Sequence, residues 1–344
     1  MKKYSAVIVG CGEISSVHAK VLTSATLAAL GVELAGVCDT KEARAQRLAD
    51  EFNVKAFTDL SVMLDACAPD VLHICLPHFL HAQAAIQALD KKIHVLTEKP
   101  MATTVADGEA MITAANKNNR TLGVIFQNRY NRGSVLIKRA VQNGDLGAIK
   151  GASLRVSWHR TADYYAASDW RGRWETEGGG AVINQSIHTF DLMNFFLGAP
   201  VTVDATIANR AHPGIEVEDI AEGVITYADG ITASFYVTNY HPYSAPVSLE
   251  ILGEKGRAEI SGGDGVIFFK DGRKITSDDE NTDSPLPPAD KIYWGNSHAL
   301  QIAEFYTALT AARTPEITGN DAIVTQRLVN AIYKSAKTNK PVSI

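Results

Sequence analysis

The residues best suited to chemistry stand at the ends of apolar runs that have the composition of buried strands. Gly10 and Gly12 follow the first run, Asp39 ends the second, and Lys99 follows a later one within Glu-Lys-Pro. Closely spaced glycines let a backbone approach an anion at a helix N-terminus, and an ammonium can hold an oxygen and take up its proton. These residues predict an anion-binding turn together with a site for proton transfer.

Three further sequence features that a dinucleotide-binding turn requires surround the glycine turn. The strand-like run "SAVIVG" leads into it, a helical pattern follows, and an aspartate ends the second strand. Ser15 stands where a third glycine or alanine would allow close packing of helix on strand, and serine is small enough for this. The predicted dinucleotide contacts in this region are Gly10, Gly12, Glu13, Ile14 and Asp39.

The carboxylate of Asp39 also bears on which dinucleotide binds. It is placed to accept hydrogen bonds from the adenosine ribose and would repel a 2′-phosphate, which favours NAD over NADP. Lys41 and Arg44 lie close by in the sequence and could tolerate that phosphate. An N-cap role for Asp39, ahead of the helical pattern at 40–52, is compatible with either cofactor.

The elements that must position these residues alternate between strand and helix as far as residue 126. This rhythm predicts a parallel, doubly wound α/β sheet in a dinucleotide-binding domain at 1–126. The remainder, 127–344, is rich in short strand-like runs separated by Asp-Gly and Gly-Gly turns. It predicts a second α/β domain with a mostly antiparallel sheet, which binds substrate and mediates oligomerisation, and closing helices that pack back toward the first domain.

Composition excludes several other classes of protein. The 344 residues carry a formal net charge of −5, so nothing indicates nucleic-acid binding. We found no apolar stretch that approaches a membrane span. The four cysteines lie in or beside apolar segments without a Cys-x-x-Cys pair, as in a protein of a reducing compartment, so a cytoplasmic location is expected. The histidines show no ligand spacing, so no metal is predicted.

Two longer blocks carry a resemblance to a known family. "CLPHFLHAQAAIQALDKKIHVLTEKPMA" at 75–102 and "GGGAVINQSIHTFDL" at 178–192 resemble signatures of the glucose–fructose oxidoreductase/inositol dehydrogenase (Gfo/Idh/MocA) family. The resemblance implies a Rossmann domain followed by an α/β domain with an open-faced antiparallel sheet. It also implies a nicotinamide-dependent oxidoreductase acting on a sugar or polyol, assembled as a homodimer or homotetramer.

The same resemblance assigns the acid–base residues. Lys99 is expected in the active site, and in the family a cis peptide usually joins this lysine to the following proline, here Pro100. His188 is expected as a second acid–base group. Asn184 stands where the family has an aspartate. An asparagine one turn before His188 can still hydrogen-bond the imidazole or the substrate, but it cannot stabilise an imidazolium by charge. The acid–base work is therefore expected of Lys99 and a neutral His188.

Further residues are candidates for the site or for its support. Asp191 is expected to brace the helix, and the glycines at 178–180 to let the backbone pass close to the cofactor or sheet. His241, Tyr243, Tyr293 and His298 are weaker candidates for the substrate side. The additional cofactor contacts predicted are Leu76, Pro77, His81, Glu98, Lys99, Gln127, Trp170 and Arg171. The predicted substrate contacts are Lys99, Asn128, Arg129, Tyr165, Asn184 and His188, with Tyr164 beside them.

Two alternative functions remain open at this point. Asn184 would suit an idle relative that senses a nucleotide or sugar and binds a protein partner. Lys41 and Arg44 would suit a reductase of the anhydrosugar or dihydrodiol type that prefers NADPH. Oligomerisation is expected through the second sheet, because its strands alternate apolar and polar residues and too few helices follow to cover both faces.

Overall fold

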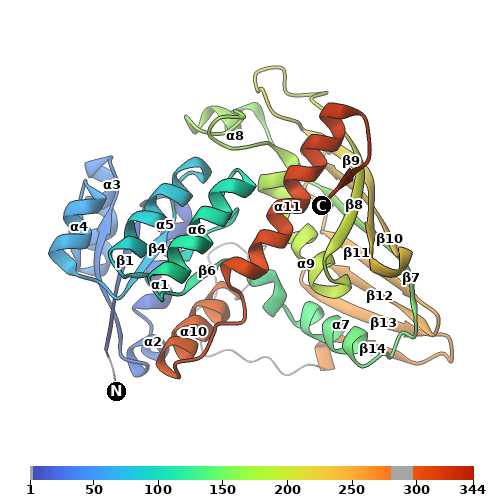
Figure 1. Cartoon of the computed structure of the whole chain (residues 1–344), viewed down its shortest axis with the longest axis horizontal. Helices are drawn as coiled ribbons and strands as arrows, with labels where there is room; N and C mark the ends of the chain where they lie inside the picture. Colours follow the sequence, from blue (N-terminus) through green and yellow to red (C-terminus); the bar gives the residue numbers. More distant parts are fainter. Residues whose placement is uncertain (1–2, 280–296) are drawn as a thin grey trace. The chain divides into compact units, whose positions relative to one another are not determined.

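The N-terminal alternation of strand and helix folds into a six-stranded sheet in which every neighbouring pair is parallel (Figure 1). The computed structural model describes residues 3–279 and 297–344. They form two compact units, and the first comprises residues 3–127 and 297–323. Its strands are β1 (Tyr4–Val9), β2 (Val32–Cys38), β3 (Lys55–Phe57), β4 (Val71–Ile74), β5 (His94–Thr97) and β6 (Leu122–Val124). The order β3-β2-β1-β4-β5-β6 confirms the predicted doubly wound sheet.

Helices flank this sheet. They are α1 (Glu13–Leu22), α2 (Ala25–Ala29), α3 (Glu42–Phe52), α4 (Leu60–Cys67), α5 (His81–Asp90), α6 (Val105–Lys117) and α10 (Ser297–Thr310), with the 3-10 turn η1 (His78–Leu80). The helical segment between β1 and β2 is divided into two helices, because the chain breaks after α1 and Ser24 caps α2 by accepting from the Leu27 N–H. Strand β3 and helix α4 were not predicted from the sequence.

The core of the first unit is completed by a helix from far along the chain. Ala6 and Ile8 of β1 share one hydrophobic cluster with Leu22 of α1 and with Ile302 and Phe305 of α10. Burial of a side chain of this size stabilises the fold by roughly 1.5–3 kcal/mol. Helix α10 thus belongs to the face of the sheet that α1 covers.

The second unit comprises residues 128–282, as far as they are described, and 324–344. Its sheet has the order β14-β13-β12-β11-β7-β10-β9-β8-β15, antiparallel except for the β7–β10 pair. The strands are β7 (Ile149–Ser157), β8 (Pro200–Ala208), β9 (Ile220–Tyr227), β10 (Thr232–Thr238), β11 (Ser248–Gly253), β12 (Gly256–Ser261), β13 (Asp264–Phe269), β14 (Lys274–Thr276) and β15 (Val342–Ser343). This confirms a mostly antiparallel sheet in an α/β unit.

Helices cover one face of this nine-stranded sheet. They are α7 (Arg132–Gln142), α9 (Ile187–Leu197) and the part of α11 (Gly319–Thr338) from Val324 onward. Helix α8 (Ala162–Ala166), the π-helical turn η3 (Ala181–Gln185) and the short turns η4 (Ala228–Gly230) and η5 (Ser277–Asp279) lie in the connections. The turn η2 (Gln127–Tyr130) leads from the last strand of the first unit into the second.

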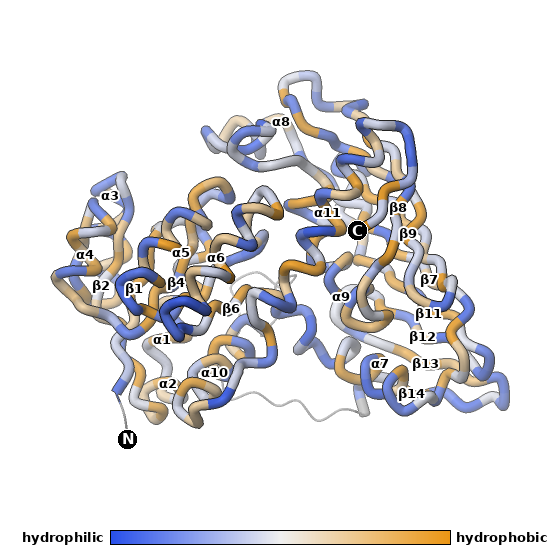
Figure 2. The backbone as a smooth tube through the Cα atoms, in the orientation of Figure 1, coloured by the Kyte–Doolittle hydropathy of each residue, from blue (hydrophilic) through white to orange (hydrophobic). Residues whose placement is uncertain are grey.

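The uncovered face of the sheet differs from the expectation. Hydrophobic and hydrophilic residues alternate along the strands (Figure 2), and most of the hydrophobic ones are buried. The positions that alternate with them are mostly polar, so the predicted apolar open face is wrong. Val224 and Leu252 are isolated exposed hydrophobics on this face. The polar residues of the face include Ser153, Arg155, Asp204, Thr206, Glu222, Thr232, Ser234, Glu250, Arg257 and Glu259.

Within the described ranges, no helix has the length and apolar character needed to cross a bilayer.

Candidate functional site

The glycine turn between β1 and α1 has the geometry of an anion cradle. Gly10 has φ +89°, and a Cβ there would lie 2.4 Å from the Cys75 carbonyl oxygen, so only glycine fits. At Gly12, the N-cap of α1, a Cβ would meet nothing within 4 Å, and no side chain of the described residues caps this helix end. The N-terminus of α1 thus faces open space, where its N–H groups suit a pyrophosphate. Ser15 is buried and donates to the Gly12 carbonyl over 2.6 Å, so serine replaces the third glycine without strain.

Asp39 links this turn to the end of β2. Its Oδ2 accepts from the Cys11 N–H at 2.9 Å and its Oδ1 from the Lys41 N–H at 2.8 Å. The side chain is half-exposed, and carboxylate oxygens can each accept a further hydrogen bond. Helix α3 begins at Glu42 with Lys41 as its N-cap, so Asp39 is not the capping residue. The carboxylate is therefore positioned by the turn and remains able to accept bonds from a ribose.

Lys99 follows β5 and is half-buried, and the expected cis peptide joins it to Pro100. The backbone N–H of Lys99 lies 3.3 Å from Oε2 of Glu98, which is buried. His81 fixes the other side of this loop, with Nδ1 2.8 Å from the Pro100 carbonyl and Nε2 2.8 Å from the Leu76 carbonyl. Burial lowers the pKa of His81, so the neutral ring donates a hydrogen bond to one of these two carbonyls and only contacts the other. His81 and Glu98 thus hold the loops around Lys99.

The predicted acid–base residues of the second unit lie on an irregular stretch of helix. Asn184 is in the π-helical turn η3, and His188 is in the first turn of α9. Both are half-buried, whereas the residues between them and beside them are buried. π-Helical turns occur mainly as short insertions, frequently at functional sites. The two side chains are therefore the accessible ones on this stretch.

A buried carboxylate orients the side chain of Asn184. Asn184 Nδ2 donates to Oε1 of Glu177 at 2.6 Å, and Glu177 Oε2 accepts from the Gly172 N–H. Glu177 is 0% exposed, so these contacts take place away from water. Because a carboxylate only accepts, the amide nitrogen of Asn184 must face Glu177, and its carbonyl oxygen faces away from that carboxylate. Asn184 thus presents an uncharged acceptor.

Aromatic and cationic side chains surround this pair. The Tyr164 hydroxyl lies 3.5 Å from Asn184 Nδ2 and 3.2 Å from Gln185 Nε2. The guanidinium of Arg171 stacks 4.3 Å above the Tyr164 ring and lies 5.4 Å from the centre of the Trp170 ring. The structure therefore brings together three of the predicted residues, Trp170, Arg171 and Asn184, with Tyr164.

Two predicted substrate residues are engaged in the packing of the second unit. Tyr165 is 6% exposed and its hydroxyl accepts from Asn239 at 3.0 Å. Arg129 forms a bidentate ion pair with buried Asp191, at 2.7 and 2.6 Å, and Thr325 also donates to this carboxylate. These bonds give Asp191 the bracing role expected of it. Two of the five N–H donors of Arg129 are occupied in this way.

The remaining predicted residues have simpler placements. Leu76, Pro77 and Asn128 are half-buried, and Gln127 is buried. His241 and Tyr243 contact each other on the surface, with ring centroids 4.6 Å apart. His298 is buried in the first unit, and Tyr293 lies outside the described residues.

The glycines at 178–180 bring the backbone against the interior of the second unit. A Cβ at Gly179 would lie 1.9 Å from the Tyr333 hydroxyl, and one at Gly180 2.0 Å from the Glu218 carbonyl. This approach lets the buried Glu218 side chain accept from the N–H groups of Gly180 and Val182, both at 2.9 Å, and from Tyr333. Burial raises the pKa of Glu218 to about 7. Glu218 thus satisfies the N–H groups at the start of η3.

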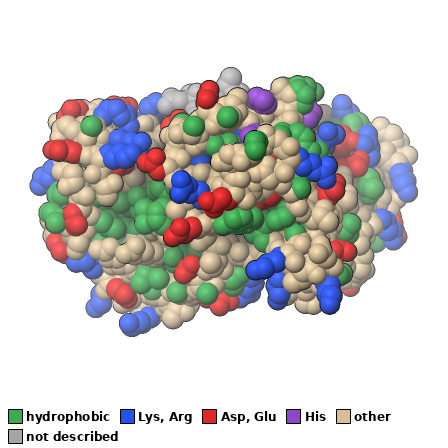
Figure 3. Space-filling view, turned by 90° about the horizontal axis from the view of Figure 1, so that it is seen from above, with side chains coloured by type: hydrophobic (Ala, Val, Ile, Leu, Met, Phe, Trp, Pro, Cys, Tyr) green, Lys and Arg blue, Asp and Glu red, His purple; other side chains and the backbone are tan. Residues whose placement is uncertain are grey.

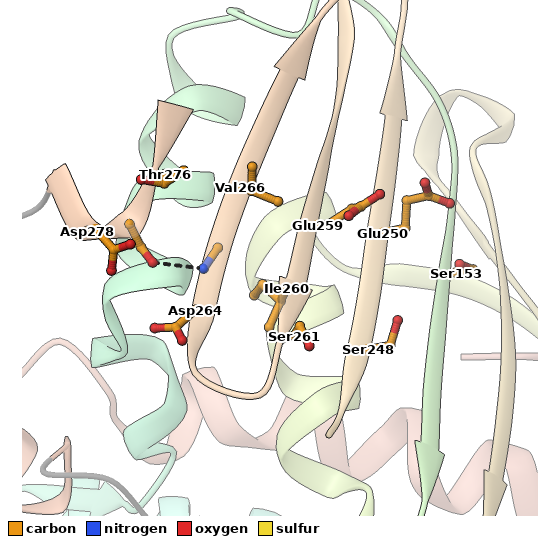
Figure 4. Close-up of a pocket in the computed structure, with 12 residues that line it drawn as sticks. Ser153, Ser248, Glu250, Glu259, Ile260, Ser261, Asp264, Val266, Thr276 and Asp278 are labelled. Carbon is orange, nitrogen blue, oxygen red and sulfur yellow. Dashed lines mark hydrogen bonds between the residues drawn. The ribbon is translucent and has the colours of Figure 1, made fainter. Parts of the chain in front are cut away.

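A hollow of about 560 Å³ lies elsewhere, on the open face of the second sheet (Figure 4). Its charged lining residues are Glu250, Glu259, Asp264 and Asp278, and Gly265 N–H donates to Ser277 at its rim. It contains none of the predicted site residues. Across the described residues, no group of three or more His, Cys, Asp or Glu side chains is arranged to hold a metal ion. Basic and acidic side chains are interspersed on the surface in Figure 3.

Several residues of these sites were missed in the sequence. Glu177 directly precedes the glycines, and its acidic side chain beside a helix start was a usable signal. Glu218 carried no local signal, because its partners are 36 and 38 residues away.

Comparison with known proteins agrees with this architecture. A family model described as "Oxidoreductase family, NAD-binding Rossmann fold" matches residues 4–126, and the "GFO/IDH/MocA C-terminal domain" matches residues 135–259. The WlbA dehydrogenase from Bordetella pertussis, solved with NADH and UDP-GlcNAcA, is 31% identical with a TM-score of 0.86, over 100% of this chain and 99% of that one.

Two curated relatives are more distant. D-glucoside 3-dehydrogenase from Escherichia coli is 25% identical over 98% of this chain and 96% of its own length. Inositol 2-dehydrogenase from Salmonella typhimurium is 28% identical over 74% of this chain and 72% of its own length. Together with the glycine turn, the Glu-Lys-Pro loop and the two sheets, these matches show that the chain belongs to the Gfo/Idh/MocA oxidoreductase family, with an NAD-binding Rossmann fold in its N-terminal part.

Proposed function

We propose that this protein is an NAD-dependent dehydrogenase that moves a hydride between the nicotinamide and a hydroxyl or carbonyl of a sugar, polyol or sugar derivative. One observation carries the proposal. The glycine turn, Asp39 and Lys99 follow the carboxyl ends of β1, β2 and β5, three parallel strands of one sheet. Ligands of doubly wound sheets bind along that edge. An anion cradle, a ribose acceptor and an ammonium are therefore presented on one side of the first unit.

The residues on that edge fit the cofactor. Gly10 and Gly12 would hold the pyrophosphate at the N-terminus of α1, beside Glu13 and Ile14, and Asp39 would accept from the adenosine ribose. Leu76, Pro77 and Gln127 would line the nicotinamide end, and Trp170 and Arg171 remain proposed cofactor contacts. His81 and Glu98 would act by holding the loops that carry these contacts. When bound, NAD supplies the hydride acceptor in one direction and, as NADH, the donor in the other.

Lys99 and His188 would do the acid–base work. In the oxidative direction the substrate C–H bond gives up a hydride, the O–H bond gives up a proton, and a carbonyl forms. Lys99 would hold the oxygen and, with a neutral His188, take up that proton. Asn184, whose amide nitrogen donates to Glu177, would hydrogen-bond the substrate through its carbonyl oxygen. Asn128 and Arg129 remain proposed substrate contacts, although Asp191 engages the Arg129 guanidinium.

The relatives support a sugar as the substrate class. D-glucoside 3-dehydrogenase and inositol 2-dehydrogenase are named for a sugar derivative and a polyol, and the WlbA structure holds UDP-GlcNAcA. The half-exposed Tyr164 ring, with Arg171 stacked on it, would contact the sugar face, and the buried Tyr165 would support it. The experiment is a panel of glucosides, inositols, free sugars and UDP-GlcNAcA, read as NADH absorbance at 340 nm.

The cofactor preference is tested separately. We expect NADH to bind at least about tenfold tighter than NADPH, a difference of about 1.4 kcal/mol. Asp39→Ser should narrow this difference, because it removes the charge that repels a 2′-phosphate. Equal affinities in the wild type, or tighter NADPH, would instead support the reductase that uses Lys41 and Arg44.

A second candidate function is an idle relative that senses a nucleotide or sugar. The uncharged Asn184 is the feature that favours it. Tight NADH binding and capture of a protein partner, without turnover of any compound in the panel, would support this function over the dehydrogenase.

A further inference from the structure

Five polar side chains are buried side by side beneath the Glu-Lys-Pro loop of the first unit. They come from α1, β4, the end of β5 and α10. The members, with their exposed fractions, are His18 (0%), His73 (0%), Glu98 (7%), His298 (3%) and Tyr306 (0%). We call this set the histidine chain. Burying so many polar groups costs free energy that an apolar set would not, unless each finds a hydrogen-bond partner.

The distances connect these groups in series. The Tyr306 hydroxyl lies 2.8 Å from His73 Nε2, and His73 Nδ1 lies 2.8 Å from His18 Nδ1. His18 Nε2 lies 3.1 Å from Glu98 Oε1, and His298 Nε2 lies 3.3 Å from the same oxygen. The other oxygen, Oε2, faces the backbone N–H of Lys99 at 3.3 Å. The series therefore runs from α10 to the peptide that carries Lys99.

Both ends of the series fix the direction of its hydrogen bonds. Burial raises the pKa of Tyr306, so its oxygen keeps the hydrogen. Among the described residues, His73 is the only hydrogen-bond partner found for that hydroxyl, so the hydroxyl donates to Nε2. At the other end, burial alone would raise the pKa of Glu98. The hydrogen bonds from His18 and His298 instead hold this pKa well below its ordinary value. An ionised Glu98 only accepts, so His18 Nε2 carries a hydrogen.

These two ends leave one arrangement of hydrogens on the two rings between them. His73 accepts at Nε2 and therefore carries its hydrogen on Nδ1. Burial lowers the pKa of His73, so this ring holds a single hydrogen. His73 Nδ1–H then donates to His18 Nδ1, which is a free acceptor if His18 holds its hydrogen on Nε2. Every donor in the series thus meets an acceptor with one hydrogen on each ring.

We propose that the histidine chain is a positioning device for Lys99, in which hydrogen bonds running from Tyr306 through His73 and His18 hold Glu98 in place and thereby fix the Lys99 peptide. His298 steadies the same carboxylate from α10. The inference rests on the proposed function, because it gives Lys99 the role of holding the substrate oxygen. A displacement of about 1 Å at such a group can cost about a hundredfold in rate.

The first test measures the hydrogen positions directly. Imidazole ¹⁵N NMR of the wild-type protein should show His73 protonated on Nδ1 and His18 on Nε2. Tyr306→Phe keeps the ring and removes only the donor, so the His73 Nε2 resonance should shift to that of an acceptor without a hydrogen bond, while Nδ1 stays protonated. His73 protonated on Nε2 in the wild type, or unchanged spectra in the variant, would overturn the inference. This test needs no substrate, so it stands even if the panel shows no turnover.

The second test measures the consequence for Lys99. We expect Tyr306→Phe to lower kcat about tenfold, equivalent to about 1.4 kcal/mol, while KM for NAD stays within about twofold. Glu98→Gln should lower kcat further, because its amide would present a donor to His18 or to the Lys99 N–H. Tyr227→Phe removes a buried hydroxyl bound to Asn194 in the second unit and is the matched control. Wild-type kcat in both Tyr306→Phe and Glu98→Gln would overturn the positioning role, whereas a wild type without turnover would count against the proposed function alone.

Discussion

At the scale of single residues, the proposed chemistry is shared between the ammonium of Lys99 and the hydrogen-bonding side chains of Asn184 and His188. Lys99 is half-buried on a loop whose flanking peptides are held by Glu98 and His81. Asn184 is held through its amide nitrogen by the buried carboxylate of Glu177. A group fixed in this way loses little freedom when a substrate binds, so its hydrogen bond is available to the transition state.

Lys99→Met should lower kcat by about 10²–10⁴-fold, the range typical of a positioned acid–base group. Methionine has a similar length but neither charge nor N–H donors. NADH binding, followed by fluorescence titration, should persist because the glycine turn and Asp39 are unchanged. Retention of wild-type turnover on a verified substrate would contradict the role given to Lys99.

Asn184→Asp should reduce activity, although it introduces the carboxylate that the family resemblance leads one to expect. The new carboxylate would stand where the amide now lies, 2.6 Å from Glu177 Oε1. Two carboxylates at this distance cannot both ionise freely, so the pair would share a proton and the pKa of one would rise. The pH dependence of kcat/KM measures this effect.

The matched control exchanges the amide of Asn184 and the carboxylate of Glu177. Combining Asn184→Asp with Glu177→Gln restores a donor beside an acceptor and should recover much of the lost activity. Asn184→Ala should raise the activation free energy by only about 0.5–1.5 kcal/mol, the net value of a neutral hydrogen bond. An Asn184→Asp variant that matched the wild type at all pH values would show that Glu177 does not govern this position.

At the scale of elements, the start of η3 and α9 depends on one buried carboxyl group. Gly180 allows the backbone to approach Glu218, whose side chain then satisfies the N–H groups of Gly180 and Val182. Tyr333 of α11 joins the same group, at 3.0 Å from Glu218 Oε1. The stretch that carries Asn184 and His188 is therefore anchored from a distant strand and helix.

This anchor predicts a pH dependence of stability. Burial raises the pKa of Glu218 to about 7, above its ordinary value of 4.5. The folded state then binds the proton more tightly than the unfolded state, so this group's contribution to stability is present below pH 4.5 and is lost as pH rises toward 7. A shift of this size corresponds to at most about 3 kcal/mol.

Thermal unfolding of the wild type and of Glu218→Gln at pH 5 and pH 8 measures that contribution. The stability difference between wild type and variant should change between the two pH values, because glutamine does not titrate. Parallel curves for the two proteins across this range would show that Glu218 does not titrate there.

At the scale of the whole molecule, the open face of the second sheet is the surface through which we expect the chain to assemble. The face is mostly polar, so the expectation of an oligomer now rests on the family resemblance rather than on exposed apolar area. Val224, 43% exposed on β9, pairs with Asp204 of β8 and is an isolated apolar residue on this face. A contact surface of this composition would rely on hydrogen bonds and charge pairs.

We expect a dimer or tetramer of the 37.1 kDa chain by light scattering at micromolar concentration. Val224→Asp would place a second carboxylate beside Asp204 on the face and should shift the mass toward the monomer. Leu252→Asp, on β11 of the same face, is a second probe, and Val62→Asp, on the exposed side of α4 in the first unit, is the control. A monomeric wild type would rule out the assembly.

The sequence by itself determined the features that depend on local pattern. The apolar runs and helical spacing predicted most strands and helices, and the glycines with Asp39 predicted the turn and its use, because strand, turn and helix are set by neighbouring residues. Only the tertiary structure decided which groups support the site. Glu98 lies 80 residues from His18, and His73 lies 233 from Tyr306, so the chain they form depends on how β4, β5, α1 and α10 pack. The polar open face was likewise decided by which side of the sheet the helices cover, a choice that alternation along a strand leaves open.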